Sequence, residues 1–147
     1  MTKFLLSVHV LAAIIAIGPV TVAASMFPAA IRRAGTGADR DLAVPRSLHR
    51  ICRVYAALGI VVPVFGLATA NSLGVLGDAW LLTSIALTTT AAAVLVLAVL
   101  PRQRLLLDAM DDTRGPARLA MFTGIFNVLW AVVTVLMIVR PGSTTGA

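Results

Sequence analysis

The residues of this chain that are best suited to chemistry are polar side chains set singly into long apolar stretches. His9 is the first of them, because an imidazole binds metal ions and exchanges a proton near neutral pH. If each apolar stretch is a helix, hydroxyl and amide groups from all four stretches lie near the level of His9: Ser7, Thr69, Asn71, Thr83, Ser84 and Thr134. Turned inward, they would form a polar pocket for a small ligand or a metal ion. The alternative is that each hydroxyl bonds to a carbonyl of its own helix and His9 lies at the membrane interface.

Haem ligation is a second possible chemistry, and it requires two axial ligands at one level. His9 and His49 lie at opposite ends of their helices, roughly 25 Å apart at 1.5 Å per residue, so they cannot hold one haem together. His9 and Met137 are the depth-matched pair, although a methionine at such a position is commonly plain packing. We therefore expect no cofactor, with haem b on His9 and Met137 as the alternative.

Two polar residues, Thr89 and Asn127, lie near the middle of their apolar stretches. A hydrogen bond between transmembrane helices is worth about 1 kcal/mol, which favours a packing role for both. The alternative is a permeation path, but neither a carboxylate nor a cation accompanies them at that depth. We expect polar packing in the middle of the bundle.

The composition and the long apolar stretches of the chain predict the helices that carry these polar residues. Of the 147 residues 59% are hydrophobic and only 12% are charged, with a mean hydropathy of +0.97, which excludes a water-soluble enzyme. Four stretches without Asp, Glu, Lys or Arg are long enough to cross a bilayer: 4–27, 54–73, 79–100 and 119–139. Backbone groups in lipid must be satisfied within their own segment, so these stretches predict helices. We predict a single all-α membrane domain, 1–147, with four transmembrane helices in an up-down antiparallel bundle, an outer hairpin at 74–78 and a disordered tail at 141–147.

The cations predict the orientation. Ten of the twelve lie in the segments 28–53 and 101–118, which are expected to be loops, whereas the opposite side has only Lys3 and Arg140. Loops rich in arginine stay in the cytoplasm, so both termini are predicted to lie outside a bacterial cytoplasmic (inner) membrane. This distribution also explains the net charge of +6 without a nucleic-acid partner.

Three of these arginines, Arg46, Arg50 and Arg53, follow helical spacing just before the second apolar stretch. Anionic lipid headgroups attract such residues by about 1 kcal/mol per cation, so we predict contact with headgroups. The alternative is a docking surface for an acidic partner. If these arginines contact headgroups, their predicted partner is the lipid bilayer.

No catalytic residues are predicted, because the chain shows no nucleophile–base pair, paired carboxylates, phosphate-binding loop or cluster of metal ligands. The expected function is that of an accessory or self-associating membrane component, not an enzyme, as a homo-oligomer or within a larger membrane complex. The alternatives are a small-ligand or metal binding or transport protein that uses the pocket around His9, and a haem-binding redox subunit. Small residues at four-residue spacing fit packing within the chain or between copies: Ala12 and Ala16, Gly66 and Ala70, and Ser84, Thr88 and Ala92.

Several short motifs resemble one known family. They are Val8-His9-Val10-Leu11-Ala12-Ala13, Gly18-Pro19, Leu48-His49-Arg50 with Tyr55, and Pro63 through Gly66. Together they resemble the small bacterial integral membrane proteins grouped as domain of unknown function 2269. That resemblance implies a four-helix inner-membrane protein and carries no site residue with it.

Overall fold

The structure is a computed structural model, and it describes residues 1–37, 39–109 and 114–142. Throughout these residues the secondary structure is helical, with no strand. The elements are α1 (Thr2–Arg33), α2 (Ala43–Leu58), α3 (Val61–Leu73), α4 (Ala79–Ala93), the π-helix η1 (Val94–Val99), α5 (Leu100–Asp108) and α6 (Gly115–Val139). The prediction of an all-α fold is confirmed.

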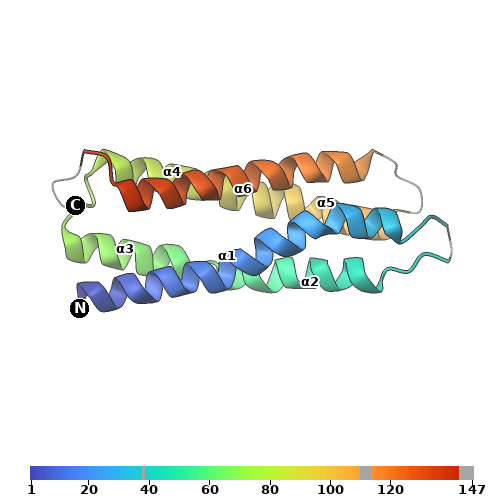
Figure 1. Cartoon of the computed structure of the whole chain (residues 1–147), viewed down its shortest axis with the longest axis horizontal. Coiled ribbons are helices and arrows are strands. Elements are labelled where there is room, and N and C mark those ends of the chain that lie inside the picture. Colours follow the sequence, from blue (N-terminus) through green and yellow to red (C-terminus); the bar gives the residue numbers. More distant parts are fainter. Residues whose placement is uncertain (38, 110–113, 143–147) are drawn as a thin grey trace.

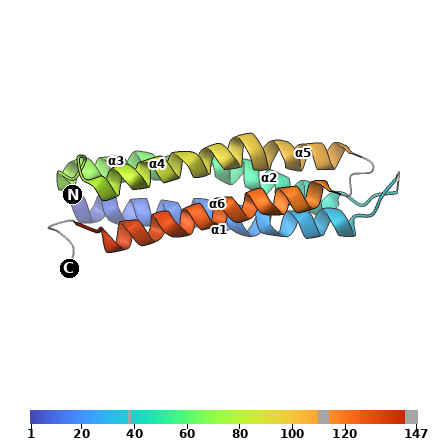
Figure 2. The same cartoon turned by 90° about the horizontal axis from the view of Figure 1, so that it is seen from above.

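These elements form four rods that lie along one another (Figure 1). α1 and α6 are rods by themselves, α2 continues into α3, and α4 continues through η1 into α5. Each rod is long and apolar enough to cross a membrane, and successive rods run in opposite directions (Figures 1 and 2). The start of α1, the end of α6 and the turn 74–78 lie at one end, which we call the terminal end. The α1–α2 and α5–α6 connections lie at the other, the arginine end.

The helices extend further than the apolar stretches that predict them. Within the segments 28–53 and 101–118, α1 continues to Arg33, α2 begins at Ala43, α5 continues to Asp108 and α6 begins at Gly115. The runs 4–27 and 79–100 are each followed directly by a proline, Pro28 and Pro101, but the helical path continues past both, through residues such as Arg, Leu, Ala and Gln that are good helix formers. Most of the arginines therefore stand on rigid helices and not on loops. Of the tail predicted to be disordered, 141–147, residues 143–147 lie outside the described part.

Proline explains the break between α2 and α3. Pro63 has no N–H to donate to the carbonyl of Gly59, as an α-helix would require. That carbonyl instead accepts from the backbone N–H of Val62 at 3.1 Å. The rod thus continues in the same direction with a local irregularity and no free carbonyl at that point.

The core is uneven along the bundle. A large apolar cluster fills the half near the arginine end, drawing on α1, α2, the end of α4, η1, α5 and α6, with Ala24, Phe27, Cys52, Val99, Leu119 and Phe126 at 0–1% exposure. A small cluster, Ala70, Val75, Trp80 and Leu81, closes the turn at the terminal end. The arginine end is thus the more tightly packed half of the molecule, and it holds its side chains in fixed places.

Candidate functional site

His9 links two helices at the terminal end. Its Nδ1 lies 2.8 Å from the backbone carbonyl oxygen of Val62 in α3, and a carbonyl only accepts, so Nδ1 carries the proton. The ring lies directly on Gly66, where an added Cβ would come within 2.8 Å of its Cε1 atom. The side chain is buried, at 8% exposure. His9 therefore fastens α1 to α3, and Gly66 leaves the space that its ring occupies.

The other residues predicted to line a pocket with His9 do not reach toward it. Five hydroxyls donate to the carbonyl four residues back in their own helix, at 2.7–2.8 Å: Ser7, Thr69, Thr83, Ser84 and Thr134. Thr69 and Ser84 are buried, whereas Ser7, Asn71, Thr83 and Thr134 are exposed on the outside of the bundle. The residues of this set lie at a similar depth along their helices, but they face in different directions. The structure brings His9 together with α3 and leaves the set dispersed.

The two residues predicted as haem ligands belong to different parts of the bundle. The His9 ring lies against α3, whereas Met137 belongs to α6, which packs on α1, α4, η1 and α5. The carbonyl of Met137 accepts from the Arg140 Nε at the end of that helix. Within the described residues there is also no group of three or more His, Cys, Asp or Glu side chains that could hold a metal ion.

Asn127 makes the polar contact between helices at mid-depth. Its Nδ2 donates to the Ser25 Oγ of α1 at 3.1 Å, while its buried Oδ1 has no partner in the described part of the chain. Thr89 is exposed and donates to the carbonyl of Ile85 in its own helix. Of the two residues predicted at this depth, only Asn127 connects helices.

A chain of three side chains near the arginine end was missed by sequence reasoning. His49 Nδ1 lies 2.9 Å from the Gln103 Oε1, and the Gln103 Nε2 donates to the Cys52 Sγ at 3.5 Å. Both Gln103 and Cys52 are fully buried, at 0% exposure. The amide of Gln103 thus bonds α5 to α2 at two points. The sequence signal for a buried Gln103 is its helical spacing with Leu106, in a segment that was expected to be a loop.

Arg40 binds the backbone carbonyls at the end of α5. Its guanidinium donates to the backbone carbonyls of Leu106, at 3.0 Å, and Ala109, where α5 ends. The last carbonyls of a helix lack partners within it and carry the negative end of the helix dipole. A cation there stabilises α5 and ties the α1–α2 connection to it.

Most of the other arginines face outward. Arg102 differs, because its guanidinium lies 4.1 Å from the centre of the Phe122 ring and donates to the Ala98 carbonyl. The exposed arginines that make no ion pair with any other described residue are Arg32, Arg33, Arg46, Arg50, Arg53, Arg104 and Arg118. They include all three residues predicted to contact headgroups. These seven arginines therefore give the arginine end a positive surface that no carboxylate within residues 1–37, 39–109 and 114–142 pairs with.

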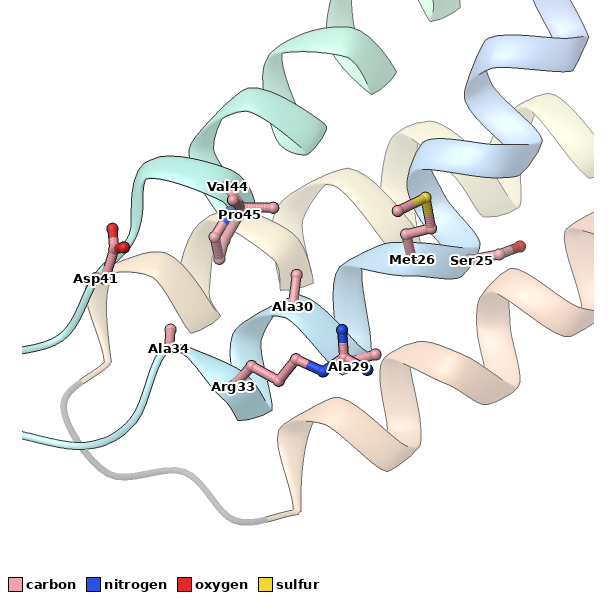
Figure 3. A pocket seen from close by; sticks show the side chains of 9 residues that line it. All are labelled: Ser25, Met26, Ala29, Ala30, Arg33, Ala34, Asp41, Val44 and Pro45. Atoms are coloured by element: carbon pink, nitrogen blue, oxygen red, sulfur yellow. The ribbon is translucent and has the colours of Figure 1, made fainter.

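An open pocket of about 490 Å³ lies between the end of α1 and the start of α2 (Figure 3). It is lined by Ser25, Met26, Ala29, Ala30, Arg33, Ala34, Asp41, Val44 and Pro45. Its walls are mainly apolar, with one cation and one carboxylate among them. Sequence reasoning missed it, because its two walls come from segments that were expected to be a flexible loop.

The chain matches no protein-family model, no curated protein sequence and no solved structure. The geometry described above is therefore the basis for the proposals that follow.

The contact between His9 and Gly66 predicts a strong coupling between these positions. In Gly66→Ala the new methyl group collides with the ring, and we expect a loss of about 1–3 kcal/mol in the free energy of unfolding. In a His9→Ala background the same change should be neutral or stabilising by up to about 1 kcal/mol, because alanine favours helix. Gly124→Ala, which meets nothing within 4 Å, is the matched control. Unfolding in mixed micelles measures the wild-type chain and its four variants, and an equal cost in both backgrounds would contradict the contact.

The bonds of Gln103 predict that Cys52 is protected. A maleimide added to the folded protein in detergent should label this thiol slowly, because it reaches the thiol only after local opening. Gln103→Ala removes the bonds to both His49 and Cys52, and should raise the labelling rate about tenfold or more. Arg104→Ala changes the exposed neighbour and should leave the rate unchanged. Equal rates in the two variants would show that Gln103 does not hold α2 and α5 together.

Proposed function

We propose that this protein is a non-catalytic component of a bacterial inner membrane, acting as an accessory or self-associating subunit of a membrane assembly. The observation that supports this is the way its polar side chains are used. Those that reach another part of the chain act as fasteners, and examples are His9 to Val62, Asn127 to Ser25, His49 to Gln103, Arg40 to the end of α5, and Thr2 to Ser72. These fasteners are spread along the length of the bundle. A rigid scaffold needs such an arrangement, whereas catalysis needs groups that converge on one reacting atom.

The proposed orientation places the arginine end in the cytoplasm and the terminal end outside. It rests on the ten cations of the segments 28–53 and 101–118 against Lys3 and Arg140. The helical extensions carry the arginines beyond the apolar stretches, so either end of the bundle can lie at the level of headgroups and water. A lipid-embedded arginine end would instead bury a row of cations at several kcal/mol each. The resemblance to domain of unknown function 2269 stays a prediction, and it implies a four-helix inner-membrane protein.

Reporter fusions test the orientation. Alkaline phosphatase folds only outside the cytoplasm, so a fusion after Ala147 should be active. A green fluorescent reporter at the same place should be dark. Fusions made after Gly37, in the α1–α2 connection, should give the opposite result. Fluorescence after Ala147 together with active phosphatase after Gly37 would reverse the proposed orientation.

Purification from the native membrane tests the subunit role. We expect either a defined oligomer or a second chain in fixed stoichiometry, measured by native mass spectrometry after gentle extraction. The same sample should lack a Soret band, since the bond of His9 Nδ1 to Val62 leaves only Nε2 for a ligand and the ring is buried against Gly66 of α3. A monomer without any co-purifying chain would contradict the subunit role, and a stoichiometric Soret band that His9→Ala abolishes would favour the haem alternative.

A further inference from the structure

The pocket between α1 and α2 combines an apolar trough with two unpaired charges. Alanines on α1, Ala29 and Ala30, leave room against Val44 and Pro45 of α2, and Met26 borders the trough at 53% exposure. Its volume of about 490 Å³ falls in the range of about 300–1,000 Å³ that is usual for small-molecule sites. It opens to the outer surface of the bundle, which in the proposed orientation is in contact with lipid.

The two charges stand at different depths. The Arg33 side chain extends back along α1 toward Ala29, whereas Asp41 stands at the mouth, just before α2 (Figure 3). One carboxylate oxygen of Asp41 accepts from the backbone N–H of Ala43 at 3.0 Å, which fixes the side chain. Neither charge makes an ion pair with the other or with any further residue of the described ranges. Both residues are exposed, so the cation beside Ala29 and the anion nearer the end of the bundle are both available to a ligand.

A hydroxyl marks the deep end. Ser25 lies two turns before Arg33 on α1, and its Oγ accepts from the Asn127 Nδ2. That bond uses a lone pair of the hydroxyl and leaves its proton free to donate. From the deep end outward, the pocket therefore offers a hydrogen-bond donor, a cation and an anion.

We propose that this pocket binds a phospholipid with a phosphoethanolamine headgroup, held in the cytoplasmic leaflet. Its phosphate pairs with Arg33, its primary ammonium donates to the free oxygen of Asp41, and an ester carbonyl accepts from Ser25. The acyl chains leave past Met26 into the hydrocarbon. The order ester, phosphate, ammonium from the bilayer centre outward matches the order of the three protein groups. The proposal rests on the membrane orientation proposed above.

The same groups discriminate against other common headgroups. Phosphatidylcholine has no N–H to donate to Asp41, because its nitrogen is fully methylated. An anionic phosphatidylglycerol headgroup offers Asp41 only neutral hydroxyl donors, so it lacks the stronger bond that an ammonium makes to a carboxylate. Exposed arginines such as Arg46 and Arg50, by contrast, attract any anionic headgroup without regard to its shape. Selectivity for the ethanolamine lipid is therefore the signature of the pocket.

The test uses the full chain in nanodiscs that contain palmitoyl-oleoyl phosphatidylethanolamine, phosphatidylcholine and phosphatidylglycerol in equal amounts. Lipids retained after transfer to detergent are counted by native mass spectrometry. We expect one ethanolamine lipid to be retained about five- to tenfold over the other two, as one charge-assisted hydrogen bond would give. Asp41→Asn keeps the bond to Ala43 and should reduce that preference to about twofold or less.

Arg33→Gln should reduce retention of the ethanolamine lipid at least about fivefold. Arg32→Gln is the matched control, because Arg32 is exposed beside it, does not line the pocket and carries the same charge. Ala29→Phe fills the trough without changing any charge, and it too should abolish retention. The slow labelling of Cys52 verifies that each variant is folded.

Equal retention of all three lipids by the wild-type chain would overturn the proposal. So would a preference for phosphatidylglycerol that Arg32→Gln and Arg33→Gln weaken alike, because that result describes general charge attraction. Either result leaves the proposed orientation intact if the reporter fusions support it. Reversed fusions would instead remove the membrane orientation on which the pocket depends.

Discussion

The rest of this structure depends on the cost of leaving a polar group without a partner in lipid. A helix satisfies its own backbone, so the four rods follow directly from the four apolar stretches. Side-chain hydroxyls meet the same constraint locally, and residues such as Ser84 and Thr69 donate to carbonyls of their own helix. His9 and Asn127 cross to another helix instead, since a ring nitrogen and an amide carried on longer side chains reach a neighbour more readily than their own backbone. The constraint is not met everywhere, because the buried hydroxyls of Thr88 and Thr123 have no partner among the described residues.

Crossing bonds and apolar packing reinforce each other near the arginine end. The large core cluster lies in that half, and within it Gln103 joins α5 to α2 while Arg40 caps α5. The π-helix η1 makes this possible. Residues Ala91, Leu95, Val99 and Gln103 are all buried and are spaced by four. In a regular α-helix each step of four residues turns the face by 40°, so three steps would carry Gln103 about 120° away from Ala91. The wider π turns of η1 absorb that rotation and keep Gln103 on the buried face.

The sequence predicted the fold class and the four rods but placed neither the helix ends nor the side-chain partners. Apolarity reports which residues can lie in hydrocarbon, whereas helix length depends on propensity and capping, so α1 and α5 continue through segments expected to be loops. The predicted pocket around His9 was a set chosen by depth alone. Depth does not state which way a side chain faces, and Thr83 and Thr134 face outward while Ser84 faces inward. The bond between His49 and Gln103 joins residues 54 positions apart, and a π-helix that sets its register has no simple mark in the sequence.

The helical extensions change what the arginines can do. On flexible loops, the arginines would form a diffuse layer of positive charge. Salt would screen this charge over about 8 Å at physiological ionic strength, and it would not distinguish headgroups by their shape. Held on α1, α2 and α5, a guanidinium instead has a fixed depth and fixed neighbours. Arg102 lies on an aromatic ring, and Arg33 lines an apolar trough with a carboxylate at its mouth. Selectivity among headgroups of similar net charge requires such fixed positions, because it depends on the order of charges along the bilayer normal. A rigid arginine end is therefore the condition on which the proposed lipid site depends.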